Sequence, residues 1–183
     1  MAKYVLYPFV FLIACGLLYI YPMQSAFDQQ DQVAYNMAYR ATTNFVDAAR
    51  NKGYITPVMY NDFVQELGTW NLYDIQLEHK AKQYHPIYSD LEDPDSFTGR
   101  TDVFYDARYT KEVMATLFPG ESTSDESASR KYYMRTGDFF SVTVRNTNTT
   151  KATLIRDFLT GNESIGYNRI YIPYGGMILN EDF

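Results

Sequence analysis

Few residues in the chain are of the types that carry out catalysis or hold metals. The histidines are His79 and His85, and the single cysteine is Cys15. There is no Gly-x-Ser-x-Gly nucleophile motif, no phosphate-binding loop and no dinucleotide fingerprint. Two histidines without an H-E-x-x-H spacing are too few for a zinc site, and one cysteine cannot form an intrachain disulfide or a multi-thiolate centre. We therefore expect no enzymatic activity and no cofactor.

His79 lies in a stretch of alternating apolar and polar residues. His79 shares the alternation of Ile75 and Leu77, which predicts that it lies on the inner face of a strand as a structural residue. A membrane-tethered hydrolase is the least supported function, because no nucleophile motif accompanies these side chains.

An acidic cluster is the one place where hard oxygen ligands, which calcium prefers, crowd together. It consists of Asp90, Glu92, Asp93 and Asp95. The cluster lacks the glycine and the terminal bidentate glutamate of an EF-hand loop. The sequence therefore favours a solvated acidic loop, with calcium binding as the weaker alternative.

The longest apolar stretch of the sequence lies at its start. Tyr4 to Met23 is a run of 20 residues without a charge. As a helix it would be about 30 Å long, enough to cross a bilayer core. Lys3 precedes the run, whereas Asp28 and Asp31 follow it. The positive-inside tendency then predicts a single-pass anchor over residues 1–23, with a cytoplasmic N-terminus and an extracytoplasmic body.

Cys15 gives an alternative interpretation of this segment. Residues 12–16 read Leu-Ile-Ala-Cys-Gly, which resembles a bacterial lipobox in which Cys15 would be lipidated. However, the apolar run continues past Cys15 to Tyr21, where lipoproteins normally become polar. A cleaved signal peptide is also considered, but only Gln24-Ser25-Ala26 offers a weak cleavage site.

The remaining residues, 24–183, form one polar and acidic body. Without Lys3 it has 15 basic side chains against 22 acidic ones, a net charge of −7. Such a body repels phosphate backbones, so we expect no nucleic-acid partner. Its length suits a single globular head.

Periodicity predicts the elements of this head. Apolar residues recur at helical spacing from Phe27 to Ala49, so the first helix should continue to about residue 52 and stop at Gly53. Thr56-Pro57 predicts the start of a second helix. Further short helices are expected over 109–118 and after Thr150, the last with Leu154, Ile155, Phe158 and Leu159 on one side.

Alternating patterns predict strands around residues 73–81, 140–145 and 169–173. The polar segment 88–102 is expected to be a loop, and Gly175-Gly176 a turn. The fold class is therefore α+β: a long N-terminal helix, apolar in its first half and amphipathic in its second, packed on a small antiparallel sheet with short helices.

This arrangement resembles type IV pilin-like proteins. More specific phrases resemble membrane-anchored proteins of Tad/Flp-type pilus clusters in Gram-positive bacteria. They are Phe45-Val46-Asp47, residues 52–57 (Lys-Gly-Tyr-Ile-Thr-Pro), residues 71–79 (Asn-Leu-Tyr-Asp-Ile-Gln-Leu-Glu-His) and residues 174–180 (Tyr-Gly-Gly-Met-Ile-Leu-Asn).

The resemblance implies a structural component of a pilus or secretion apparatus, whose helix contacts the membrane and other subunits. The sequence departs from classical pilins, which carry a prepilin-peptidase site and a glutamate at the fifth position of the mature helix. Here no glycine precedes a Phe/Met-x-x-x-Glu run, and residues 4–23 contain no acid. A minor pilin-like or assembly protein therefore fits better than a major subunit. The alternative is an extracytoplasmic ligand-binding module, either lipidated at Cys15 or membrane-anchored.

Overall fold

The structure is a computed structural model that describes residues 2–68, 71–90, 93–120, 124, 127–161 and 170–182. Its helices are α1 (Ala2–Lys52), α2 (Pro57–Gly68), α3 (Thr110–Leu117) and α4 (Lys151–Thr160), with short 3-10 turns at Pro94–Ser96 and Ala128–Arg130. Its strands are β1 (Tyr54–Ile55), β2 (Tyr73–Tyr88), β3 (Phe97–Tyr109), β4 (Tyr132–Tyr133), β5 (Phe139–Asn146) and β6 (Tyr171–Met177). The predicted α+β class is confirmed.

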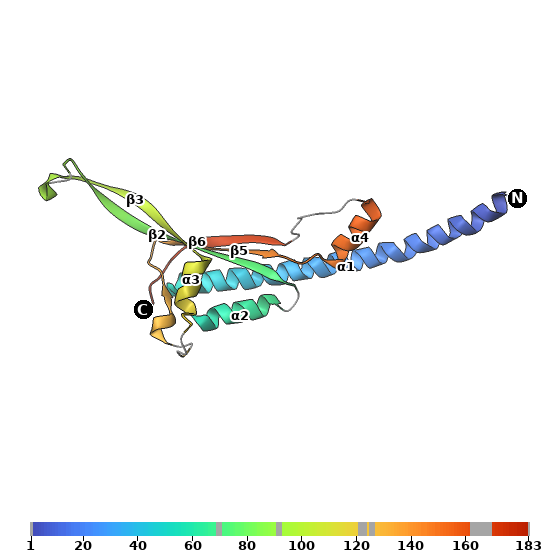
Figure 1. The fold of residues 1–183 in the computed structure, drawn as a ribbon, viewed down its shortest axis with the longest axis horizontal. Coiled ribbons are helices and arrows are strands. Elements are labelled where there is room, and N and C mark those ends of the chain that lie inside the picture. The colour runs from blue at the N-terminus through green and yellow to red at the C-terminus, as the bar shows by residue number, and fades with distance from the viewer. Residues whose placement is uncertain are drawn as a thin grey trace.

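The long helix α1 forms the spine of the molecule, and the head covers only its second half (Figure 1). Its buried apolar side chains begin at Ala34 and continue to Ala49, at the predicted helical spacing. The helix ends where the sequence predicts. Gly53 adopts the left-handed conformation, with φ of 74°, and its N–H donates to the carbonyl of Ala49 at 2.9 Å. This is the usual glycine stop of a helix.

Helix α2 packs beside α1 and closes one side of the core. Its start is the predicted one: the Thr56 hydroxyl accepts the Met59 N–H at 3.2 Å, and Pro57 occupies the first helical position, where no N–H is needed. Phe63 of α2 stacks on Phe45 of α1 with ring centroids 4.5 Å apart. The two helices are thereby joined through aromatic burial.

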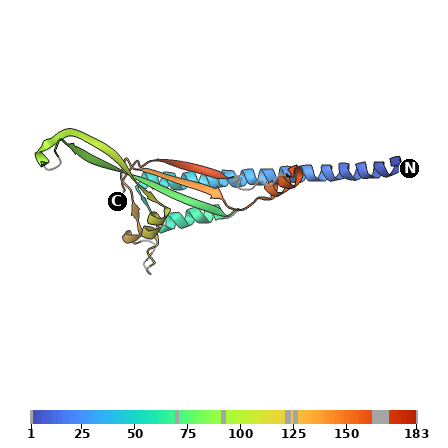
Figure 2. The ribbon, with the colours of Figure 1, turned by 45° about the horizontal axis from the view of Figure 1, so that its top comes forward.

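A four-stranded antiparallel sheet packs against α1, in the order β3-β2-β5-β6 (Figure 2). Leu77 pairs with Val142, and Ile75 pairs with Val144, so these side chains lie on one face. Leu77, Val142 and Val144 are fully buried in the core, while alternate residues face outward. A separate two-stranded sheet pairs β1 with β4.

Two predicted turns or loops are wrong. The expected loop over 88–102 includes strand β3, which begins at Phe97 and pairs with the extended β2. No apolar alternation indicates this strand because nearly all of β3 is exposed. The expected turn at Gly175-Gly176 lies within β6. There the missing side chains allow close approach, since a Cβ on Gly176 would collide with the Arg50 guanidinium.

Helices α3 and α4 lie close to the predicted positions. Where β3 ends, the Thr110 hydroxyl accepts the Leu77 N–H at 2.8 Å, and the chain turns into α3. At α4, the Thr150 hydroxyl accepts the Thr153 N–H as its N-cap. Ala152 and Thr153 are the buried residues of α4, whereas Leu154, Phe158 and Leu159 of its predicted apolar side are exposed and Ile155 is half-buried.

Candidate membrane and assembly surface

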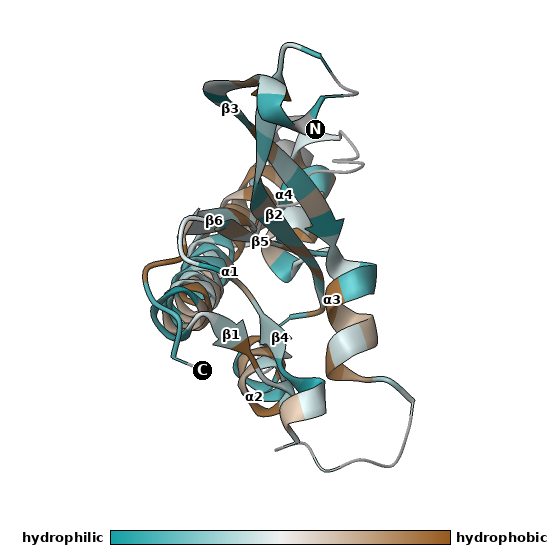
Figure 3. Ribbon diagram, turned by 90° about the vertical axis from the view of Figure 1, so that its left-hand side faces the viewer, coloured by the Kyte–Doolittle hydropathy of each residue, from teal (hydrophilic) through white to brown (hydrophobic). Residues whose placement is uncertain are grey.

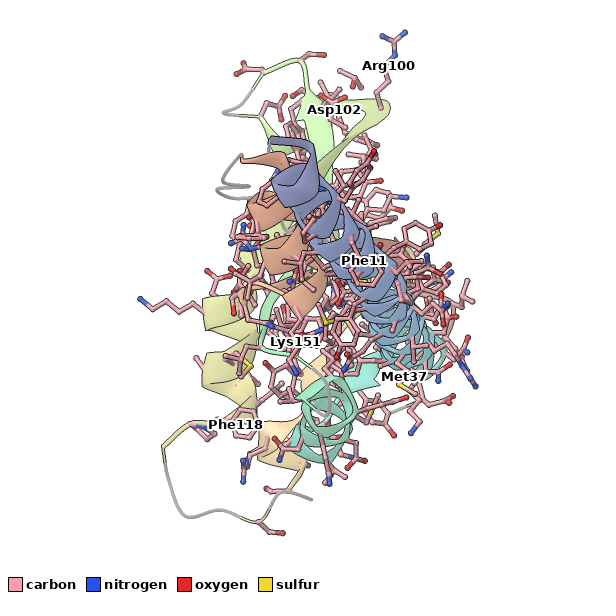
Figure 4. All side chains as sticks on the ribbon, turned by 90° about the vertical axis from the view of Figure 1, so that its right-hand side faces the viewer. Phe11, Met37, Arg100, Asp102, Phe118 and Lys151 are labelled. Carbon is pink, nitrogen blue, oxygen red and sulfur yellow. The ribbon has the colours of Figure 1, made fainter. Side chains whose placement is uncertain are left out.

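The first half of α1 has no cover from the head. Its described apolar side chains are largely exposed, among them Phe11, Leu12, Leu17 and Leu18. The helix projects from one end of the head (Figure 1), and Phe11 points away from its axis into the surroundings (Figure 4). It is long and apolar enough to cross a membrane. An uncovered apolar helix of this length is compatible with a membrane anchor.

Helix α4 is fixed to α1 just after this exposed segment. The Thr150 hydroxyl donates to the Asp31 carboxylate at 2.7 Å, and both groups are buried. Arg156 Nη2 lies 3.5 Å from Asp28 Oδ1. The Asp31 carboxylate also lies beside the N-terminus of α4, where its negative charge interacts favourably with the positive end of the helix dipole. The acids that follow the apolar run therefore position α4 beside α1.

The start of α4 makes a further contact with α1. The Lys151 ammonium lies 5.6 Å from the centroid of the Phe27 ring, a cation–π distance. Viewed from the N-terminal end, α4 stands directly beside α1, with Lys151 at their junction (Figure 4). Both cations of α4 thus face groups on α1.

A second projecting element lies at the opposite end of the head. Beyond the Lys80–Phe139 pair, β2 no longer contacts β5 and pairs with β3 alone. The resulting two-stranded arm extends away from the head (Figures 1 and 3), and Arg100 and Asp102 project from its outer part (Figure 4). It carries exposed aromatic side chains, which are suited to protein contacts. They are Tyr84, Tyr88, Phe97, Phe104 and Tyr105.

His79 lies at the base of this arm, in a buried polar cluster. Its ring is only 2% exposed. Nδ1 lies 2.8 Å from the Tyr132 hydroxyl, and Nε2 lies 3.0 Å from Asp138 Oδ2. Asp138 also accepts the backbone N–H groups of Lys82 and Arg135, both at 2.8 Å. The carboxylate therefore joins β2 to the turn before β5.

Burial lowers the pKa of His79 from its ordinary value, and the hydrogen bond to Asp138 opposes this effect only in part. A neutral ring satisfies both contacts: Nε2–H donates to Asp138, and Nδ1 accepts the Tyr132 hydroxyl proton. Both ring nitrogens are then engaged. The buried position of His79 confirms the predicted inner face of the strand, and its hydrogen bonds join β2 to β4 and to the turn before β5.

A hollow of about 700 Å³ adjoins this cluster. Lys82, Arg108 and Arg135 are the basic residues of its lining. The Lys82 ammonium lies over the Tyr84 ring at 4.9 Å, and Arg108 lies 3.6 Å from Asp106.

The predicted acidic cluster lies at the tip of the arm. Asp93 caps the 3-10 turn by accepting the Asp95 N–H at 3.0 Å, and the Ser96 hydroxyl donates to the carbonyls of Asp90 and Asp93 at 2.7 Å. Glu92 lies outside the described residues. Within the described part of the chain, no three acidic, histidine or cysteine side chains gather as a metal site requires.

The other candidate residue is Cys15, and it lies on the uncovered half of α1. Its side chain is exposed, and the helix continues through it without a break to Lys52. His85 lies on the exposed arm, where its ring contacts Phe104 edge-on at 5.1 Å. The structure brings neither residue near His79.

Comparisons with protein families, with curated proteins and with solved structures found no match to this chain.

Proposed function

We propose that the protein is a structural, non-enzymatic, membrane-anchored component of a type IV/Tad-like pilus or secretion apparatus, as a minor pilin-like or assembly protein. Its N-terminus lies in the cytoplasm and its head lies outside the cell membrane. The uncovered apolar half of α1 carries this proposal. The second half of α1 is covered by the head, whereas the first half exposes apolar side chains over a length that could cross a bilayer.

The same half of α1 serves two contacts in this proposal. It crosses the membrane, and it packs against the apolar helices of other subunits. Small residues such as Ala14 and Gly16 leave room for close helix approach. At the far end of the head, the aromatic arm supplies a second surface for protein partners.

A structural role agrees with the chemistry of the head. The described histidine–carboxylate pair, His79 and Asp138, is almost entirely buried at the wall of the hollow, and both ring nitrogens of His79 are hydrogen-bonded. The absence of acid from residues 4–23 supports a minor or assembly role over that of a major subunit. The apolar run that continues past Cys15 to Tyr21 supports a retained anchor over a lipoprotein.

Photocross-linking in cells of the native host tests the proposal. A photoreactive phenylalanine analogue replaces Phe11 on the bare helix, with the same replacement of Phe139 on the head sheet as the control. We expect position 11 to cross-link to membrane proteins of a pilus or secretion machine, in bands absent at position 139. Cross-links to lipid alone would contradict the assembly role.

Mass spectrometry of the purified N-terminus separates the related alternatives. We expect an intact or Met-trimmed start. A diacylated Cys15 would replace the anchor by a lipoprotein, and a methylated internal residue would instead indicate processing as in classical pilins.

A further inference from the structure

We propose that α4 is a second membrane contact, which lies on the bilayer surface beside the anchor and inserts its outward apolar side among the lipid headgroups. This inference rests on the proposed membrane insertion of α1. The contact through α4 involves a different part of the molecule and would determine the orientation of the head relative to the bilayer.

The first observation is the exposure of α4. Phe158 is 82% exposed, Leu154 58% and Leu159 44%. The helix turns Ala152 and Thr153 toward the core, so Leu154, Phe158 and Leu159 are not part of the buried core of the head. The larger apolar side chains of an amphipathic helix normally face the core, and here the orientation is reversed.

The second observation is the position of α4 along α1. Asp28 follows Met23 by five residues, a rise of about 8 Å along the helix. The headgroup region on each side of a bilayer is roughly 5–8 Å thick. A contact at Asp28 therefore lies at the outer edge of the headgroups when residues 4–23 fill the hydrocarbon core.

The third observation is the direction of α4. Its start contacts Asp31 through Thr150, and a later turn contacts Asp28 through Arg156. The helix thus advances toward the N-terminus of α1, which brings Phe158 and Leu159 nearer the membrane than Arg156. Figures 1 and 2 agree, since α4 is the described element of the head that reaches furthest toward the N-terminus.

The charge of α4 indicates which lipids it would contact. Lys151 lies over Phe27, and Arg156 faces Asp28, so both cations of the helix are directed at α1. The contact is therefore apolar in origin, as in helices that lie in the interface plane. We expect it in bilayers of zwitterionic phosphatidylcholine, without a requirement for anionic lipid.

Spin labelling of the full chain tests this contact. In a Cys15→Ser background, single cysteines Leu12→Cys, Phe158→Cys and Val103→Cys carry a nitroxide. The protein is reconstituted into phosphatidylcholine vesicles at less than one chain per vesicle. Electron paramagnetic resonance then measures collision of each label with oxygen, which concentrates in lipid, and with a water-soluble nickel chelate.

We expect the oxygen-to-nickel ratio to be highest at position 12, lower at 158 and lowest at 103, an exposed apolar position on the arm. Leu154→Cys gives a second position on α4 and should resemble 158. A label at 158 that matches 103, while 12 remains lipid-like, would overturn this inference and leave the anchor intact. A label at 158 shielded from both reagents would also overturn it, in favour of a protein contact. A water-like label at 12 would overturn the anchor itself.

Discussion

The Thr150 hydroxyl donates to the carboxylate of Asp31 at 2.7 Å, and this buried hydrogen bond joins α4 to α1 across 119 residues of sequence. Thr150 is also the N-cap of α4, because its oxygen accepts the Thr153 N–H. One side chain thus starts the helix and fixes its position on the spine.

Removal of this hydroxyl should loosen α4. Thr150→Val keeps the size of the side chain but removes the N-cap and the hydrogen bond to Asp31. We therefore expect the free energy of unfolding to fall by about 1–2 kcal/mol. Amide hydrogen exchange of the detergent-solubilised full chain should speed up in α4. Thr150→Ser retains the hydroxyl and serves as the control. Equal exchange in the valine variant and the wild type would contradict this role of Thr150.

The buried His79 should make stability depend on pH. Its pKa in the folded chain lies below the ordinary value of 6.5. As the pH falls below about 6.5, His79 becomes protonated in the unfolded chain but stays neutral in the folded chain. The free energy of unfolding therefore falls with pH until the lower pKa of the folded chain is reached. Thermal unfolding of the full chain in detergent should therefore show a falling midpoint from pH 7 to pH 5.

His79→Gln should flatten this dependence, whereas His85→Gln on the exposed arm should leave it unchanged. The same slope in the His79→Gln variant as in the wild type would assign the pH dependence to other groups.

Asp138 should be a major contributor to the stability of the head. It accepts the N–H groups of Lys82 and Arg135 and binds His79. In Asp138→Asn one carboxylate oxygen becomes an NH₂ group that faces hydrogen-bond donors. We therefore expect the free energy of unfolding to fall by about 3 kcal/mol. Asp106→Asn changes an exposed ion pair and should cost less than about 1 kcal/mol. Urea unfolding followed by circular dichroism compares the two variants, and equal midpoints would contradict the prediction.

Gly53 should tolerate no side chain. It has φ of 74°, and a Cβ there would collide with the backbone carbonyl oxygen of Asn180. Gly161 has a similar φ of 66°, but among the described residues no atom lies within 4 Å of the position that a Cβ would take. Gly161→Ala therefore measures the left-handed backbone cost of about 1–2 kcal/mol, and Gly53→Ala should exceed it. Thermal melts that rank the two variants in the opposite order would contradict the close approach of the C-terminal segment.

The sequence predicts the elements whose signals are local. The continuation of α1 to residue 52, its stop at Gly53 and the Thr56-Pro57 start of α2 follow from spacing and capping alone. The alternation of Phe140, Val142 and Val144 predicts β5 because one of its faces is buried.

The remaining features depend on contacts between distant segments. Strand β3 is exposed, so no alternation indicates it, and its pairing with β2 defines the aromatic arm. The outward orientation of α4 follows from the bonds of Thr150 and Arg156 to acids on α1, which lie more than a hundred residues away. Local periodicity groups the apolar side chains of α4 correctly, but it cannot indicate which way they face.

Alkaline carbonate extraction of membranes from the native host tests the central claim most directly, namely that the bare half of α1 holds the protein in a membrane. The wild-type chain should remain in the membrane pellet, and Leu12→Arg/Leu18→Arg should move to the supernatant because two charges at the core of the run are costly to insert. Val103→Arg on the arm is the matched control and should stay in the pellet. Release of the wild-type chain into the supernatant would contradict the claim.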